Sequence, residues 1–391
     1  ALPDVVTTPQ MALLLFISIQ KFVLFDIFFH YTIGFLGLIW FYRKYHFSSY
    51  TFAILFFLFC FNGYIFSHYT VGHFTWSGYF LFPAFFAMII RFLEGEEGWL
   101  WVTLLSFLLF YVILTGSQHH YVWLLLFMGF LGIVCWRRVK WIIAVVISSG
   151  LLSAIRLLPP VLQLNDYRQK GIFNAIFGYP SIGHMIESMI LIKLPSISPV
   201  DYFTLDTYTE NYWDFNFFIG VIGFGFVAFW GIYYWLREKS PRWQPMIIPT
   251  FALIALSIET TYWIVRATGI PLFDSERATG RILGVPMVWL FIVSATLFQE
   301  WWNSQKFNFT NQVIALIALV FMVIEIVSNM NAWSPSVIRN YFTPVEMNIS
   351  GSSVANHLDP IYLLTLSIGL FLTIGTGIFL VLKTYKEKRN K

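Results

Sequence analysis

Side chains that could do chemistry are scarce in this chain, and most of them fall near the ends of long apolar segments. Only 11% of the 391 residues are charged. An ionisable residue inside a membrane span costs about 2.5–3.5 kcal/mol on insertion scales, so each one is a functional hypothesis. The residues concerned are Asp26, His30, Arg156, Asp214, Glu259, Arg281 and Glu325, with six histidines in the loops beside them: His68, His73, His119, His120, His184 and His357.

The stretch 164–213 and the start of the apolar segment after it carry a first candidate group for acid–base chemistry. Glu210 and Asp214 lie next to each other in "YTENYWDFNFFIG" (208–220), and Lys193, Arg168 and Lys170 lie upstream. Carboxylates near cations at a membrane interface suit proton transfer or the binding of a phosphate-bearing substrate. An ordinary amphipathic surface loop is the alternative interpretation.

A pair of arginines forms a second candidate group. In "DSERATGRILGVP" (274–286), Arg277 and Arg281 are four positions apart at the start of an apolar segment. Two guanidiniums placed in this way could bind the phosphate or diphosphate of a lipid-linked substrate bidentately. Anchoring to lipid headgroups is the alternative.

Three histidines are further candidates for substrate binding. His119 and His120 lie in "TGSQHHY" (115–121), and His73 lies in "SHYTVGHF" (67–74). The alternative interpretation of 115–121 is a simple polar hairpin between two spans. Adjacent positions on a regular element point apart, and no third ligand is spaced to join these two, so we predict no metal site at His119 and His120 and assign no metal ligand.

Arg156 is the last candidate for substrate binding. It precedes Pro159 and Pro160, so its alternative role is to snorkel or to bond the carbonyls that the prolines free.

Asp26 and His30 are four positions apart and could equally satisfy one another. We expect several of the ionisable groups to face one another or a common hydrated pocket in the outer half of the bundle, with His73 and residues 117–120 at its rim, because isolated charges in lipid would be costly. The groups expected there are Asp26, Arg156, Asp214, Glu259 and Glu325.

Membrane helices must position these side chains. Hydrophobic residues make up 58% of the chain, whereas a soluble domain carries about 25% charged residues and could not hide so much apolar surface. Segment 9–20 predicts a short interfacial or re-entrant helix. Eleven longer apolar runs predict an all-α bundle of about eleven spans: 22–41, 49–66, 76–92, 98–115, 121–136, 141–163, 214–236, 245–260, 281–300, 311–329 and 361–382.

The positive-inside rule orients these spans. Alternate loops are basic, as at 43–44, 137–140 and 237–242, whereas 67–74 and 115–121 contain no Lys or Arg. The prediction is a multi-pass protein of the cell membrane whose C-terminal tail, 383–391, is cytoplasmic and whose given start is external. We expect residues upstream of Ala1, and one helix there would give twelve spans. The chain is one membrane domain (1–391) with external loops at 164–213, 261–280 and 330–360.

Six segments follow one another in an order and spacing typical of one family of membrane enzymes. They are "TTPQ" (7–10), "FNGYIFSHYTVGHFTWSGYFLFPAFF" (61–86), "LTGSQHHYVWLLL" (114–126), "LLSAIRLLPPVLQL" (151–164), "ENYWDFNFFIGVIGF" (210–224) and "RATGRILGVPMVWL" (277–290). In this ordered set the chain resembles the YfhO-like branch of bacterial GT-C membrane glycosyltransferases.

The resemblance implies a GT-C-like bundle that transfers a sugar from a polyprenyl-phosphate carrier to an acceptor outside the membrane. The catalytic acid of that family lies in the first external loop, where this sequence offers Asp4. Asp4, Glu210 and Asp214 are therefore the catalytic candidates, beside Lys193 and the other substrate-binding residues above. An inverting transfer also needs cations or a divalent metal ion to stabilise the leaving phosphate.

Two other functions stay open. A transporter or flippase of a lipid-linked or anionic substrate would place its charges near the midplane between repeated halves, whereas these charges cluster at one face. A non-catalytic subunit of a larger membrane complex would use the apolar helices as packing surfaces. The expected partners are membrane lipids, the polyprenyl-phosphate-linked sugar and, for a subunit, other membrane proteins; nucleic acid is not among them.

Overall fold

The computed structural model describes residues 7–160, 177–192, 213–237, 243–269, 276, 278–305, 309–334 and 360–389. Within these residues all regular secondary structure is helical. β pairing is limited to two isolated bridges, Phe177 with Ala278 and Tyr179 with Ile258. The all-α class is therefore confirmed, while the GT-C bundle stays a prediction.

The first part of the chain folds into closely spaced helices, in which the η elements are 3₁₀-helical. Their bounds are η1 (Pro9–Leu15), α1 (Ile19–Lys44), α2 (Ser49–Cys60), α3 (Gly63–Thr70), η2 (Phe74–Leu81), α4 (Phe82–Leu93), α5 (Trp99–Leu114), α6 (Gln118–Val134), η3 (Trp136–Arg138) and α7 (Val139–Leu152). A further helical stretch follows at 154–160. The short helix predicted within 9–20 is present as η1, and Leu15 and Phe16 at its end are each 82% exposed, as suits an interfacial element.

The second part of the chain adds the remaining helices, of which η5 is a π-helical stretch. Their bounds are α9 (Ile182–Ile190), η4 (Trp213–Phe215), α10 (Gly220–Phe226), η5 (Val227–Tyr234), α11 (Trp235–Arg237), η6 (Gln244–Met246), α12 (Ile247–Leu256), α13 (Glu259–Arg266), η8 (Thr279–Leu283), α14 (Gly284–Ser304), α15 (Phe309–Ala332) and α17 (Pro360–Arg389).

Seven helical segments among the described residues are long and apolar enough to cross a membrane. An eighth is possible if α6 and η3–α7, which are bent by 109° at their junction, form one broken span. Two of the eleven predicted spans correspond to shorter helices, Trp99–Leu114 and Gln244–Leu256. The predicted count of eleven is thus not confirmed, because apolar runs in sequence do not fix how long each helix stays straight.

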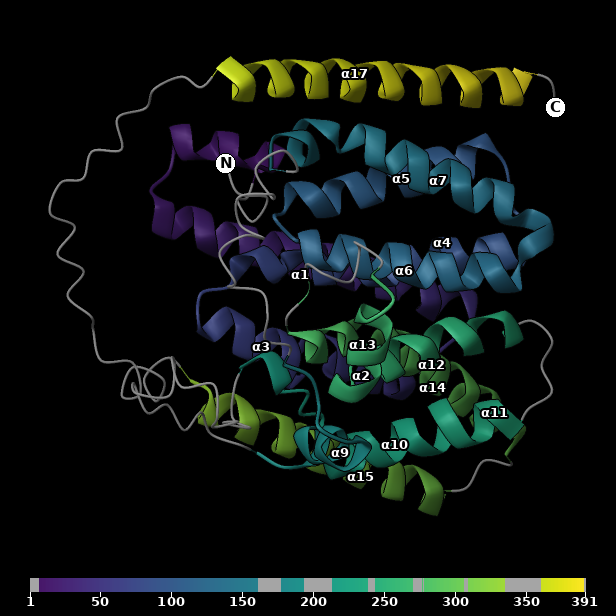
Figure 1. Cartoon of the computed structure of the whole chain (residues 1–391). Coiled ribbons are helices and arrows are strands. Elements are labelled where there is room, and N and C mark those ends of the chain that lie inside the picture. The colour runs from purple at the N-terminus through teal and green to yellow at the C-terminus, as the bar shows by residue number, and fades with distance from the viewer. Residues whose placement is uncertain are drawn as a thin grey trace, which may run out of the picture.

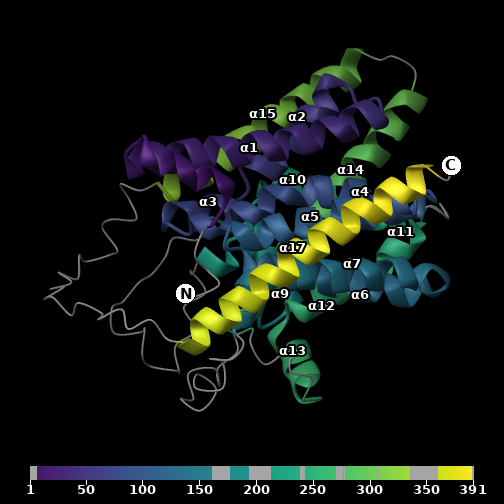
Figure 2. The same ribbon diagram turned by 90° about the horizontal axis from the view of Figure 1, so that it is seen from above.

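The helices lie side by side in a bundle with α14 in its interior and α15 and α17 at opposite edges (Figure 1). The most apolar window of Thr279–Ser304 is 100% buried, whereas those of α15 and α17 are each 17% buried. α17 crosses over α5 and α7 (Figure 2). Exposed apolar faces of this extent on α15 and α17 suit contact with lipid.

Basic residues collect at one end of the bundle, here called the basic end. Ion pairs join neighbouring helices and loops there: Lys44 with Glu94, Arg91 with Glu96, and Arg138 with Glu97. Such grouping is what the positive-inside pattern requires, although assigning this end to the cytoplasm stays a prediction. The opposite ends of the same helices, here called the site end, carry the aromatic and ionisable residues described next.

Candidate functional site

Polar and aromatic side chains gather around the buried indole of Trp76 at the site end. The Trp76 ring centroid lies 4.3 Å from that of His68 and 4.7 Å from that of His120. His119 lies 6.0 Å away by the same measure, and Arg281 Cζ lies 5.2 Å from the indole centroid. We call this group the Trp76 cluster, with the members Tyr64, His68, His73, Trp76, His119, His120, Trp123, Asp214, Glu276 and Arg281.

A break in the second span positions the first members of the cluster. Asn62 accepts a hydrogen bond from Ile65 N at 3.3 Å and so caps α3, while its amide donates to two carbonyls at the end of α2. Tyr64 and His68 are four positions apart on α3 and share one face. The sequence predicts one span at 49–66, and the break at Asn62 sets the direction of this face.

Two glycines allow segments distant in sequence to meet at the cluster. A Cβ at Gly78 would lie 2.5 Å from Ser117 Cβ, and Gly78 N donates to Ser117 Oγ at 3.0 Å. A Cβ at Gly284 would lie 2.9 Å from Tyr64 Cζ. Because no larger residue fits at either position, these contacts fix η2 beside α6 and α14 beside α3.

Asp214 and Arg281 form a bidentate pair across two helix starts. Arg281 Nε donates to Asp214 Oδ1 at 2.7 Å, and Arg281 Nη2 donates to Oδ2 at 2.8 Å. Asp214 is buried, whereas the Arg281 side chain keeps 14% exposure. Within the described residues, Arg281 Nη1 makes no hydrogen bond. The pair therefore holds the guanidinium in one orientation with one nitrogen available to a ligand.

His119 and Glu276 form a second pair beside Arg281. His119 Nδ1 lies 2.9 Å from Glu276 Oε2, and the same oxygen accepts a hydrogen bond from Trp123 Nε1 at 3.2 Å. Glu276 Oε1 accepts from Ala278 N at 3.1 Å. His119 and Trp123 are four positions apart on α6, so one helix face holds the carboxylate.

The charge of Glu276 determines the tautomer of His119. Burial by itself raises the pKa of Glu276, but His119, Arg281 and the Ala278 amide lower it by more, so the net pKa lies below its ordinary value of 4.5. An ionised carboxylate only accepts hydrogen bonds, so Nδ1 of His119 carries a proton. In the neutral ring, Nε2 is then a free base, and the His119 side chain is 28% exposed.

Three buried ring nitrogens in the cluster have no hydrogen-bond partner within the described part of the chain: Trp76 Nε1, His68 Nε2 and His120 Nδ1. The other ring nitrogens of the two histidines are paired, His68 Nδ1 with His73 Nδ1 at 3.1 Å and His120 Nε2 with the Tyr64 hydroxyl at 2.9 Å. Unpaired buried polar atoms cost free energy, so each one needs an explanation, and a catalytic or binding role is one such explanation.

A divalent metal ion does not fit the described residues. No three His, Cys, Asp or Glu side chains among them are arranged to hold a metal ion. His68 illustrates the reason, because its two ring nitrogens face different residues, His73 and Asp214, with the Asp214 oxygen 3.9 Å away. We therefore derive no chemical step that passes through a metal.

The predicted site residues divide into three sets. The structure brings together Asp214, His73, His119, His120 and Arg281. It places Arg156 elsewhere. Four predicted residues lie outside the described part of the chain: Asp4, Lys193, Glu210 and Arg277.

The prediction that several of these groups face one another or a common pocket is wrong for Asp26, Asp214 and Glu325, because each of the three binds different partners. Asp26 accepts a hydrogen bond from Gln10 Nε2 at 2.9 Å and lies 3.3 Å from His30 Nδ1, in agreement with the alternative that Asp26 and His30 satisfy one another. Glu325 accepts hydrogen bonds from the amides of Val221 and Ile222 at the start of α10. Asp26 and Glu325 thus each find polar partners nearby without a common pocket.

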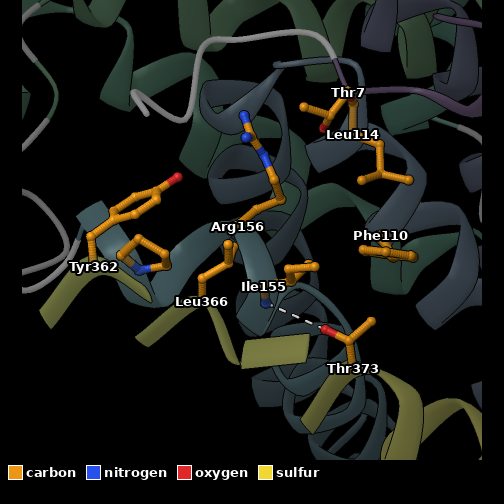
Figure 3. A pocket seen from close by; sticks show the side chains of 9 residues that line it. Thr7, Phe110, Leu114, Ile155, Arg156, Tyr362, Leu366 and Thr373 are labelled. Atoms are coloured by element: carbon orange, nitrogen blue, oxygen red, sulfur yellow. Dashed lines mark hydrogen bonds between the residues drawn. The ribbon is translucent and has the colours of Figure 1, made fainter. Parts of the chain in front are cut away.

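Arg156 lines a separate cavity of about 300 Å³ between α5, the 154–160 helix and α17 (Figure 3). Thr373 Oγ1 accepts a hydrogen bond from Ile155 N at 3.3 Å and donates to Leu152 O at 2.8 Å. Among the described residues, the lining consists of Thr7, Phe110, Leu114, Ile155, Arg156, Pro159, Tyr362, Leu366 and Thr373.

The sequence predicted no role for five members of the cluster: Tyr64, His68, Trp76, Trp123 and Glu276. The signal for Glu276 was its place in a short polar stretch five positions before Arg281. Tyr64 and Trp76 lie among many aromatic residues, and nothing in their spacing distinguishes them from lipid-facing ones.

Comparison with known proteins adds no relative: no family model, no curated protein and no solved structure matches this chain.

Proposed function

We propose that this chain is a GT-C-type glycosyltransferase that moves a sugar from a polyprenyl-phosphate carrier to an acceptor hydroxyl at the site end. The observation that supports it best is that the His119–Glu276 pair and Arg281 both contact the indole of Trp76. A fixed base and a fixed cation that contact the same indole match the two needs of an inverting transfer, which are proton removal from the acceptor and charge stabilisation on the leaving group.

In the proposed reaction, the acceptor oxygen forms a bond to the anomeric carbon while the bond from that carbon to the phosphate oxygen breaks. The polyprenyl phosphate leaves with the electron pair, and Nε2 of His119 takes the proton of the acceptor hydroxyl. Glu276 orients the imidazole and stabilises the imidazolium that forms, as a carboxylate does in other histidine pairs. Arg281 Nη1 stabilises the charge of the leaving phosphate.

This proposal gives Asp214 a role different from that of a base. Both of its carboxylate oxygens bind Arg281, so Asp214 is suited to fix the guanidinium in position. His119 then takes the place of the carboxylate base predicted from sequence. Asp214 is a poor base because both of its oxygens already accept hydrogen bonds from Arg281.

The position of the charges supports a transferase over a transporter. Transporters bind their substrates near the midplane of the membrane. The described members of the Trp76 cluster lie at helix ends instead: His68 near the end of α3, His119 at the start of α6 and Asp214 in η4.

The test is transfer from a radiolabelled polyprenyl-phosphate hexose in proteoliposomes. We expect His119→Gln to lower the transfer rate by about 10²–10⁴-fold, the usual contribution of a general base, and to leave donor binding unchanged. We expect Arg281→Ala to weaken donor binding by about 1.5–3 kcal/mol, the scale of a hydrogen bond to a charged group.

His184→Gln is the matched control, because His184 lies on α9 outside the cluster and bonds Ser181 at 2.9 Å. Its transfer rate should equal that of the wild type. Wild-type rates in both the His119 and the Arg281 variants, in folded protein, would remove the proposal.

A further inference from the structure

The last turn of α17 carries a group of basic side chains at the basic end of the bundle, far from the Trp76 cluster. We call this group the α17 basic stripe, and its members are Lys386, Lys388 and Arg389. All three side chains are exposed, and so is the neighbouring Tyr385, at 64%. One helix end thus presents three cations and a phenol ring to its surroundings.

Glu387 fixes the rotation of this helix end. Its Oε2 accepts hydrogen bonds from the first two amides of α5, at 2.8 and 3.3 Å. Consecutive residues of an α-helix are about 100° apart, so Tyr385 and Arg389, two positions on either side of Glu387, point away from α5. The two lysines of the stripe lie between these directions, and the whole stripe therefore faces outward.

The stripe differs from the other cations of the basic end in its pairing. Lys44, Arg91 and Arg138 each pair with a glutamate of the loop before α5. No member of the stripe forms an ion pair within the described part of the chain. The glutamate on the same turn, Glu387, directs its carboxylate to the α5 amides instead. The stripe is therefore suited to bind anions from outside the bundle.

The environment of α17 indicates which anions these are. α17 lies at the edge of the bundle (Figure 1), and its most apolar window is only 17% buried, as suits a helix in contact with lipid. Phe379 and Leu382, just before the stripe, are 46% and 54% exposed. The apolar face ends at Tyr385, a residue type enriched at the membrane interface. The stripe follows directly, at the level of the lipid headgroups.

We infer that the α17 basic stripe binds the phosphate groups of anionic phospholipids in the leaflet at the basic end. Clustered Lys and Arg side chains next to a membrane helix attract anionic headgroups. A zwitterionic lipid presents the same phosphate with its own ammonium beside it, so a lipid of net negative charge is preferred. Because Glu387 joins this turn to α5, bound lipid would also hold α17 against the start of α5. The inference does not depend on the proposed function, since the stripe and the Trp76 cluster share no residue.

The experiment measures the local lipid composition at the stripe. The full chain, with Cys135→Ser, is reconstituted in vesicles with equal amounts of phosphatidylglycerol and phosphatidylcholine, and a fluorophore is attached to Tyr385→Cys. Quenching is compared between the two lipids, each carrying the same nitroxide on its acyl chain. We expect phosphatidylglycerol to be enriched about five-fold, the effect of about 1 kcal/mol for one basic residue near an anionic surface. Sodium chloride should lower this enrichment by screening.

A fluorophore at Phe371→Cys is the control position, because Phe371 is 77% exposed on the same helix, about four turns before the stripe. The two lipids should quench it equally. Replacing all three members of the stripe with Gln should lower the enrichment at position 385 to the value at position 371. Lys386→Arg combined with Lys388→Arg keeps the charge and should keep the enrichment.

Three outcomes would overturn the inference. The first is equal quenching by the two lipids at position 385 in the chain with an intact stripe, which would leave an acidic protein segment as the better partner. The second is an enrichment that the triple Gln change does not alter or that the two Arg changes abolish, since charge would then not be its cause. The third is complete loss of enrichment with inorganic phosphate where sodium chloride of equal ionic strength has little effect, since the stripe would then bind the free anion.

Discussion

Glu276 is buried, yet its carboxylate accepts three hydrogen bonds and lies near the Arg281 guanidinium. In a medium of low dielectric, an ionised carboxylate persists only with such partners. His119 Nδ1, Trp123 Nε1 and the Ala278 amide supply them. Removing the charge should therefore affect stability as well as chemistry, and the sign of the effect follows from the pKa of Glu276.

We expect Glu276→Gln to lower the free energy of unfolding by about 1–3 kcal/mol near neutral pH, the scale for lost charged hydrogen bonds. The folded-state pKa of Glu276 is lowered from its ordinary 4.5. Its ionised form thus contributes stability above pH 4.5, and this contribution is lost as the pH falls through the folded-state pKa. In chemical unfolding experiments in detergent, the free energy of unfolding of the wild type should approach that of Glu276→Gln as the pH is lowered from 5.

The control is Glu96→Gln, because the Glu96 side chain is 54% exposed and pairs with Arg91 at the basic end. Its effect on unfolding should be small at every pH. A difference between the wild type and Glu276→Gln that grows as the pH falls below 4.5 would contradict the expected sign.

Single residues of the site were predictable where a charged side chain falls at the end of an apolar segment. Asp214 and Arg281 stand out because charge at the end of an apolar run is expensive without a partner, although their pairing could not be read from positions 67 apart. Glu276 lies in an irregular stretch without periodicity, so sequence gave no reason to bury it. The base role proposed for His119 depends on that contact, and so it could only come from the structure.

At the scale of elements, α17 docks through small residues and hydroxyl groups. A Cβ at Gly369 would lie 2.7 Å from both Ala154 O and Ile155 Cα, which are backbone atoms that cannot move aside. Near the basic end, the hydroxyls of Thr384 and Thr103 lie 2.8 Å apart. Close approach of backbones through small residues is the usual means of helix association in membranes.

We expect Gly369→Ala to loosen α17 from the bundle and to cost about 1–3 kcal/mol, the range for overpacking. Gly375→Ala on the same helix is the control, because a Cβ there meets nothing within 4 Å. The readout is the rate of disulfide formation between cysteines placed at Thr103 and Thr384. Slower cross-linking in Gly375→Ala than in Gly369→Ala would show that the docking contact is misassigned.

Apolar runs predicted where most helices lie, because burial in lipid depends mainly on composition. The ends of α1, α14 and α15 fall within a few residues of the predicted spans. Internal breaks were not predictable, since they depend on tertiary contacts. The cap at Asn62 and the π-helical stretch η5, which packs on α14, are the two examples.

At the scale of the whole molecule, the two ends of the bundle differ in chemistry. The basic end holds the cations of the loops with their surface ion pairs, and the site end holds buried carboxylates, histidines and aromatic rings. The Trp76 cluster and the Arg156 cavity both lie at the site end. A donor and an acceptor of sugar would thus meet on the side of the membrane that the positive-inside pattern assigns to the exterior.

This orientation leads to the last prediction, which uses a membrane-impermeant maleimide on intact cells. Cysteine at Ala267, after α13 at the site end, should be labelled from outside, and cysteine at Ser304, at the far end of α14, should be labelled only after permeabilisation. Both positions are exposed in the structure. Replacing the half-buried Cys135 with Ser removes the accessible native thiol, since Cys60 is buried. If only the cysteine at position 304 is labelled in intact cells, the orientation is the reverse of the predicted one. The site end would then face the cytoplasm, and a transferase at the outer face would be excluded.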